Sequence, residues 1–135
     1  MDNIKESKIK NEIMQMLKSF YEVYAREGSD DELSNFLHEK VFAITPDEAK
    51  RFKGRINCIN AWKKRYAGKK IYSWDAYDYE IHIYGGGKFA VMSYYFDMVY
   101  DVNGKKTKYK GRDMIVLIKE SGKWVIVADQ FSPSP

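Results

Sequence analysis

The residues best suited to chemistry lie in the second half of the sequence: Arg112, Asp129, Tyr77 and Tyr95. An aspartate buried among aromatic rings has a raised pKa and can act as a general base near neutral pH. A tyrosine hydroxyl polarises a carbonyl group, and the planar arginine fork donates two hydrogen bonds to a carbonyl or an anion. The candidate catalytic residues are therefore Asp129 and Tyr95, with Asp97 and Tyr77 as their alternatives.

The same residues leave three functions open. If Arg112 pairs with Asp129, the ion pair lowers the pKa of the aspartate and weakens it as a base. This favours a noncatalytic pocket that binds a small, partly hydrophobic molecule with a carbonyl or anionic group. The first alternative is a cofactor-independent enzyme of isomerase, cyclase or dehydratase type that uses an Asp base with Tyr and Arg polarisation. The second is a dimerisation or assembly module with a vestigial pocket.

The first half of the sequence has the periodicity of helices. Apolar residues recur every three or four positions over residues 8–26, which predicts an amphipathic helix with Gly28 as its C-cap. Ser29 and Glu32 have the spacing of a capping box, which predicts a short second helix through Leu37.

The next segments alternate between strand, loop and helix. A brief strand is predicted over residues 41–44, a polar loop over 47–53 and a third helix over 55–66, closed by Gly68. No linker or internal repeat interrupts the sequence, and its length is that of one domain. We therefore expect a single domain over residues 1–135.

From residue 71 the apolar period changes to two, which is typical of strands. Asn103-Gly104 and Ser121-Gly122 have the composition of two-residue hairpin turns, and three glycines separate the first two strands. The predicted strands cover residues 71–84, 88–102, 106–119 and 123–132. Helices followed by a four-stranded meander predict an α+β fold with the helices on one face of the sheet.

The turns predict which residues share a face, because they set the pairing of the strands. Val102 is expected opposite Lys105, Glu120 opposite Lys123, and Tyr84 opposite Lys88. One face then has an aliphatic end and an aromatic, charged end, which is the profile of a pocket. Together with the helices, it gives the predicted ligand-binding residues: Tyr24, Trp62, Tyr66, Tyr77, Tyr79, Tyr95, Arg112, Asp129 and Phe131.

The opposite face mixes large apolar side chains, such as Trp74 and Phe96, with acidic ones. No helix remains to cover it, so we expect a homodimer through this outer face of the sheet. If the two faces are exchanged, the polar group of the pocket becomes Asp78, Asp113 and Gln130.

The overall composition restricts the partners to a small-molecule ligand and a second copy. The 23 Lys and Arg residues outnumber the 19 Asp and Glu residues but are scattered, whereas a nucleic-acid binder clusters them. Cys58, His38 and His82 give no metal-ligand spacing, so neither a metal nor a cofactor is expected. There is no signal-peptide core and no apolar run of membrane-spanning length, which predicts a cytoplasmic protein that binds no membrane.

The C-terminal strands resemble those of SnoaL-like proteins of the nuclear transport factor 2-like fold, which also includes ketosteroid isomerase. The similar segments are Gly111-Arg112-Asp113-Met114, residues 119–124, and Val127-Ala128-Asp129-Gln130-Phe131-Ser132, with Gly54-Arg55 ahead of Trp62 resembling the start of the family's third helix. The resemblance implies a cone-shaped fold with N-terminal helices packed on a highly curved, mainly antiparallel β-sheet. Ala128 and Gln130 stand where many relatives have histidines, so it implies no imidazole chemistry.

Overall fold

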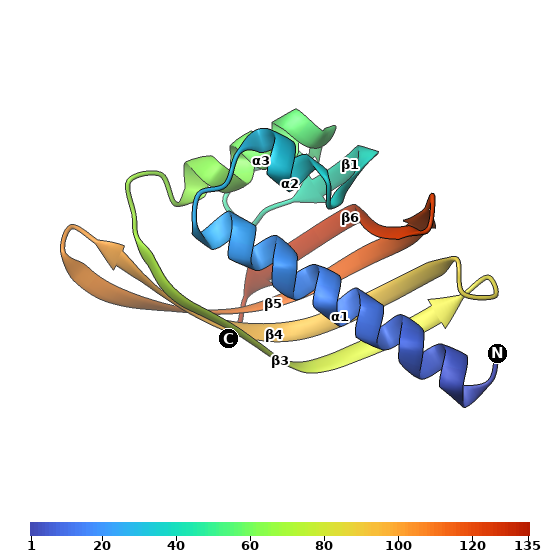
Figure 1. Ribbon diagram of the computed structural model, residues 1–135. Coiled ribbons are helices and arrows are strands. Elements are labelled where there is room, and N and C mark those ends of the chain that lie inside the picture. Colours follow the sequence, from blue (N-terminus) through green and yellow to red (C-terminus); the bar gives the residue numbers. More distant parts are fainter.

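The computed structural model describes residues 1–135 and has three helices and a six-stranded sheet (Figure 1). Figure 1 shows α1 crossing one face of the sheet, with α2 and α3 beside its C-terminal end. This arrangement confirms the predicted α+β fold. The elements are α1 (Asn3–Ala25), α2 (Asp30–Ser34), β1 (Leu37–Ile44), β2 (Phe52–Lys53), α3 (Arg55–Arg65), β3 (Ile71–Tyr84), β4 (Phe89–Val102), β5 (Lys105–Glu120) and β6 (Lys123–Pro133).

The strands are ordered β2-β1-β6-β5-β4-β3, and every neighbouring pair is antiparallel except β1 with β6. The sequence analysis missed β2 and extended the second helix to Leu37, where β1 in fact begins. Both errors have one cause. Leu37 pairs with Ile126 of β6, and Phe52 pairs with Ala43, so the pairing partners lie outside the local sequence window.

The helices begin where their caps predict. Asp2 accepts a hydrogen bond from the Lys5 backbone N–H at 2.7 Å, and the predicted capping box of Ser29 and Glu32 is present. The end of α1 differs from the prediction, because Glu27 rather than Gly28 has the left-handed backbone, with φ of 57°. Gly28 is needed for close packing instead, since a Cβ there would lie 2.4 Å from Val23 Cγ1.

The two short turns confirm the predicted register. Asn103 and Gly104 both have positive φ, as a two-residue hairpin of this kind requires. Val102 accordingly pairs with Lys105, and Glu120 pairs with Lys123.

Bulges shift the register elsewhere in the sheet. Tyr84 pairs with Phe89 and not with Lys88, and the register of β3 changes between Tyr77 and Glu80, where Asp78 has φ of 55°. Bulges of this kind insert one residue, so the side chains on either side of the insertion exchange faces.

A second bulge, in β6, decides the composition of the inner face. Leu117 pairs with Ile126 but Val116 pairs with Ala128, so Val127 is the inserted residue. Beyond it, Asp129 and Phe131 turn toward the helices. On β4 and β5 the face assignment from sequence was reversed, because the buried residues are the members of the opposite set: Met92, Tyr94, Phe96, Met98, Asp113, Ile115 and Leu117.

The core forms between this inner face and the buried stripe of α1. The stripe consists of Ile9, Ile13, Leu17 and Phe20, as its periodicity predicts. No helix has both the length and the apolar composition needed to cross a membrane.

Candidate functional site

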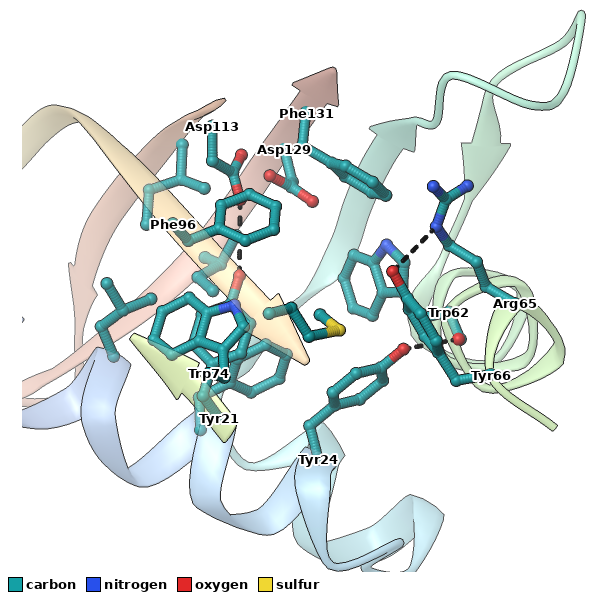
Figure 2. A pocket seen from close by; sticks show the side chains of 15 residues that line it. Tyr21, Tyr24, Trp62, Arg65, Tyr66, Trp74, Phe96, Asp113, Asp129 and Phe131 are labelled. Atoms are coloured by element: carbon teal, nitrogen blue, oxygen red, sulfur yellow. Dashed lines mark hydrogen bonds between the residues drawn. The ribbon is translucent and has the colours of Figure 1, made fainter. Parts of the chain in front are cut away.

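A cavity lies between α1, α3 and the inner face of β3–β6 (Figure 2). The space between its lining atoms is about 580 Å³ with its mouth included, of which about 50 Å³ is accessible to the centre of a water-sized sphere. The enclosed part holds a few water molecules, so a ring molecule bound here would also occupy the mouth. Its 15 lining residues are Leu17, Phe20, Tyr21, Tyr24, Trp62, Arg65, Tyr66, Trp74, Phe96, Met98, Asp113, Ile115, Ile126, Asp129 and Phe131.

A hydrogen-bonded chain of two tyrosines and an aspartate forms one wall. The Tyr94 hydroxyl on β4 donates to Asp113 Oδ2 on β5 at 2.7 Å. The Tyr21 hydroxyl on α1 lies 2.7 Å from that of Tyr94 and 3.4 Å from Asp113 Oδ2. Tyr21 is held flat against Trp74, with ring centroids 3.5 Å apart. These contacts fix the Asp113 carboxyl group in a site that is otherwise apolar.

Asp129 stands beside Asp113 because the β6 bulge turns it inward. Asp129 pairs with Ile115 in the ladder, so it is the diagonal neighbour of Asp113 on the same face. Burial, and then the charge of Asp113, raise the pKa of Asp129 well above its ordinary value. Burial also raises the pKa of Asp113, although hydrogen bonds from Asp129 and the two tyrosines oppose this effect. Burial and the neighbouring charge of Asp113 thus both favour the protonated form of the Asp129 carboxyl group.

Three polar side-chain atoms of the cavity residues have no hydrogen-bond partner. Oδ1 of Asp113, Oδ1 of Asp129 and Nε1 of Trp74 are all sealed from solvent without a hydrogen-bond partner. Buried polar atoms without partners are uncommon and costly. All three residues line the cavity, which makes these atoms candidates for hydrogen bonds to a bound molecule.

Aromatic side chains and one arginine border the other side of the cavity. The Tyr24 hydroxyl donates to the Trp62 carbonyl at 2.6 Å, which ties α1 to α3. Arg65 Nε donates to the Tyr66 hydroxyl at 3.4 Å, and its guanidinium lies 4.9 Å from the centroid of the Phe131 ring. Figure 2 shows these side chains facing the cavity across from Trp74 and Tyr21.

The predicted ligand-binding residues divide between the cavity and the outer face of the sheet. Five of them line the cavity: Tyr24, Trp62, Tyr66, Asp129 and Phe131. Tyr79 also points inward, but it packs on Tyr94 at a centroid distance of 5.7 Å and does not line the cavity.

Tyr77, Tyr95 and Arg112 lie on the outer face, against the sequence analysis. The two tyrosines stack on one another with centroids 6.1 Å apart, and Arg112 Nε donates to Ser132 Oγ at 2.9 Å. The predicted pair of Arg112 with Asp129 does not form, because the bulge at Val127 and the reversed face of β5 separate them.

The sequence analysis missed several cavity residues that a closer reading of spacing could have found. Tyr21 falls one position beside the predicted helix stripe, where Leu17, Tyr21 and Tyr24 are four and three residues apart. Arg65 stands three residues after Trp62 on the same helix face. Asp113 belongs to the exchanged-face alternative, whose other members, Asp78 and Gln130, are exposed.

The arrangement provides acid–base chemistry. A carboxyl group with a raised pKa beside a second carboxyl group can both give and accept a proton. The two tyrosines keep their protons, because burial and then the Asp113 charge raise the pKa of Tyr21 and of Tyr94 well above the ordinary phenol value. No group of three or more His, Cys, Asp or Glu side chains is placed to hold a metal ion.

Solved structures with the same fold cover nearly the whole chain. An NTF2-like protein from Cytophaga hutchinsonii has a TM-score of 0.75 and 16% identity, with 99% of this chain and 100% of that chain covered. A ketosteroid isomerase-like protein from Erwinia carotovora atroseptica has a TM-score of 0.73 and 13% identity, with 93% and 96% covered. A candidate scytalone dehydratase from Novosphingobium aromaticivorans reaches 0.81 at 11% identity, with 99% and 89% covered.

Identities this low show a shared fold and leave the activity open. Among curated proteins, none matches the sequence significantly. The sequence pattern of the SnoaL-like domain matches residues 13–135, which is most of the chain. The chain therefore belongs to the SnoaL-like family, as the spacing of its C-terminal residues implies.

Proposed function

We propose that the cavity binds a small, largely apolar molecule with a carbonyl or hydroxyl group and that Asp129 exchanges a proton with it. The observation that carries this proposal is the placement of Asp129 beside Asp113 in an aromatic cavity, where burial and then the Asp113 charge raise the pKa of Asp129. A carboxyl group with a raised pKa is suited to both giving and taking protons near neutral pH.

The chemistry would be that of a cofactor-independent isomerase or dehydratase. Trp74 Nε1–H would donate a hydrogen bond to the ligand oxygen, since it has no other partner. Asp129 would take a proton from the ligand as the carboxylate and return one to it as the carboxylic acid. The objection raised by an Arg112 partner falls away, because that arginine lies on the outer face. Relatives of this fold named as isomerase-like or as a dehydratase are consistent with such a reaction.

Deuterium exchange into a ketone tests this proposal. With 1-indanone in deuterated buffer, the wild-type protein should accelerate exchange at the carbon next to the carbonyl, as followed by NMR. Asp129→Asn should lower that acceleration by about 100-fold or more, because general acid–base groups contribute on this scale. Asp97→Asn on the outer face is the matched control. No acceleration by the folded wild type, or equal rates for Asp129→Asn and wild type, would contradict the proposal.

We also propose that the outer face of the sheet binds a second copy of the chain. Met114, Tyr77 and Tyr95 are 56%, 45% and 42% exposed on this face, which no helix covers. The face also carries both Arg112 and Asp97, so a twofold-related copy would bring opposite charges together. The dimer expected from the sequence is thus retained, with the members of the outer face corrected.

Sedimentation equilibrium tests the second copy. The wild type should have twice the chain mass of 15.9 kDa. Met114→Glu should shift it toward the monomer, because a charge would be buried in the interface. Met14→Glu, on the exposed side of α1, is the control. A wild-type monomer at all concentrations would rule out this interface.

A further inference from the structure

We propose that Arg65 selects ligands that carry a carboxylate, and that Asp47 occupies this arginine until such a ligand replaces it. The inference rests on the proposed function, since it concerns the same cavity and names the class of ligand. It assigns a binding role to a residue that the acid–base chemistry does not use.

Arg65 is placed within the cavity and not at the protein surface. Its side chain is only 15% exposed and lines the same cavity as Asp129. Its guanidinium lies 4.9 Å from the ring of Phe131, which is two residues after Asp129 on the same strand. The rings of Tyr66 and Tyr109 flank it at 5.7 and 5.5 Å. A charged group held between aromatic rings is poorly hydrated and binds an anion strongly.

Two polar groups beside Arg65 make no hydrogen bond within the protein. Nε of Arg65 donates to Tyr66 and Nη1 contacts Asp47, whereas Nη2 makes no hydrogen bond to the protein and is not sealed from solvent. The Tyr109 hydroxyl is buried without a partner. An anion seated on the guanidinium would accept from Nη2 and give the neighbouring phenol an acceptor.

Asp47 occupies the position on Arg65 that the anion would take, and the anion can displace it. It belongs to the loop between β1 and β2, its side chain is 54% exposed, and Oδ1 lies 2.8 Å from Arg65 Nη1. Ion pairs with such an exposed member contribute little to stability. A ligand carboxylate whose ring is buried in the cavity can therefore displace Asp47 at small cost, because the ring supplies the remaining binding energy.

The residues at the two ends of the cavity then specify the two polar groups of the ligand. Asp129 and Trp74 face the carbonyl or hydroxyl group, aromatic side chains enclose the ring, and Arg65 receives the carboxylate. A carboxylate fits better than a phosphate, because one guanidinium and one phenol balance a single negative charge and the planar fork matches a planar anion.

Two probes that differ only in the carboxylate test the role of Arg65 by calorimetry: 2-naphthol and 6-hydroxy-2-naphthoate. The wild type should bind the naphthoate about tenfold more tightly or better, the usual contribution of a hydrogen bond to a charged group. Arg65→Gln should remove this difference, so that the two probes bind with similar affinities. Lys64→Gln is the matched control, since Lys64 is the exposed neighbour on the same helix.

Asp47→Asn tests the exchange without disturbing the cavity wall. Removal of the competing charge should tighten naphthoate binding by about threefold, the scale of an exposed ion pair, and leave 2-naphthol unaffected. Equal affinities of the wild type for the two probes, or weaker naphthoate binding by Asp47→Asn, would overturn the inference. So would a failure of both probes to bind.

The two proposals can fail separately. If the naphthoate preference depends on Arg65 but Asp129→Asn leaves ketone exchange unchanged, the proton-transfer function is wrong and the carboxylate site stands. If Asp129 governs exchange but Arg65→Gln and Lys64→Gln have the same effect on both probes, only the carboxylate site is wrong.

Discussion

The sheet carries a tyrosine–aspartate pair on each face. The two pairs have the same residue types but differ in hydrogen-bond distance and in exposure to solvent. On the inner face, Tyr94 donates to Asp113 at 2.7 Å, and both residues are buried. On the outer face, Tyr77 donates to Asp97 at 3.3 Å, and Lys110 lies 3.5 Å from the same carboxyl oxygen, in contact with solvent. Burial raises the pKa of Asp113 and of Tyr94. The protonation behaviour of a residue here therefore depends on which face of the sheet carries it.

The comparison also shows how little sequence separates the two environments. Tyr94 and Tyr95 are adjacent, as are Arg112 and Asp113, and each pair is split between the faces. One inserted residue, Val127, is enough to bring Asp129 to the inner face. A site of this kind is created by the bulge and by the helices that cover one face.

The largest expected difference between the faces is in packing. Ile115→Ala should lower the free energy of unfolding by about 2–5 kcal/mol, because it removes buried methyl groups and leaves a cavity. Met114→Ala, the adjacent outer residue, should change it by no more than about 0.5 kcal/mol in the monomer. Urea unfolding at low protein concentration measures both. Comparable losses would mean that the outer face is also covered.

A smaller difference is expected between two adjacent hydroxyl groups. Tyr94→Phe removes the 2.7 Å bond to buried Asp113 and should cost about 1–3 kcal/mol, since a buried acceptor loses a donor. Tyr95→Phe should have almost no effect, because that side chain is exposed and its hydroxyl makes no hydrogen bond within the protein. The same unfolding experiment compares them. An equal cost for both would show that the Tyr94 bond adds no net stability.

Much of the fold could be predicted from the sequence because its signals are local. The stripe of α1, the capping box at Ser29, and the turns at Asn103-Gly104 and Ser121-Gly122 act over a few residues. The short strand β2 could not be predicted, since its two residues, Phe52 and Lys53, are strand only through pairing with β1.

The candidate site was predicted less well for a related reason. On β4 and β5, both faces of the sheet carry large apolar residues. Periodicity therefore shows which residues share a face but not which face the helices cover. The bulges at Asp78 and Val127 then break the alternation in β3 and β6. Asp129 and Phe131 were placed correctly in the cavity because two deviations, the reversed face and the bulge, cancel for these residues. Arg112 lies on β5, where no residue is inserted, so the reversed face is not compensated there.

The smallest expected effect is the pH dependence of stability. Because the folded-state pKa of Asp113 and of Asp129 is raised, their favourable contribution is complete below the ordinary value of 3.8 and is lost as pH rises through the folded values. The wild type should therefore lose stability over this range. Asp129→Asn should flatten the loss and be the more stable protein at basic pH by on the order of 1 kcal/mol.

Urea unfolding from about pH 4 to about pH 9 measures this difference, with Asp97→Asn as the outer-face control. The control should follow the wild-type curve, because its carboxyl group is exposed in the folded and unfolded states alike. If Asp129→Asn also runs parallel to the wild type, folding does not raise the pKa of Asp129. The inner pair would then differ from the outer pair in burial alone, and the basis for proton transfer in the cavity would be lost.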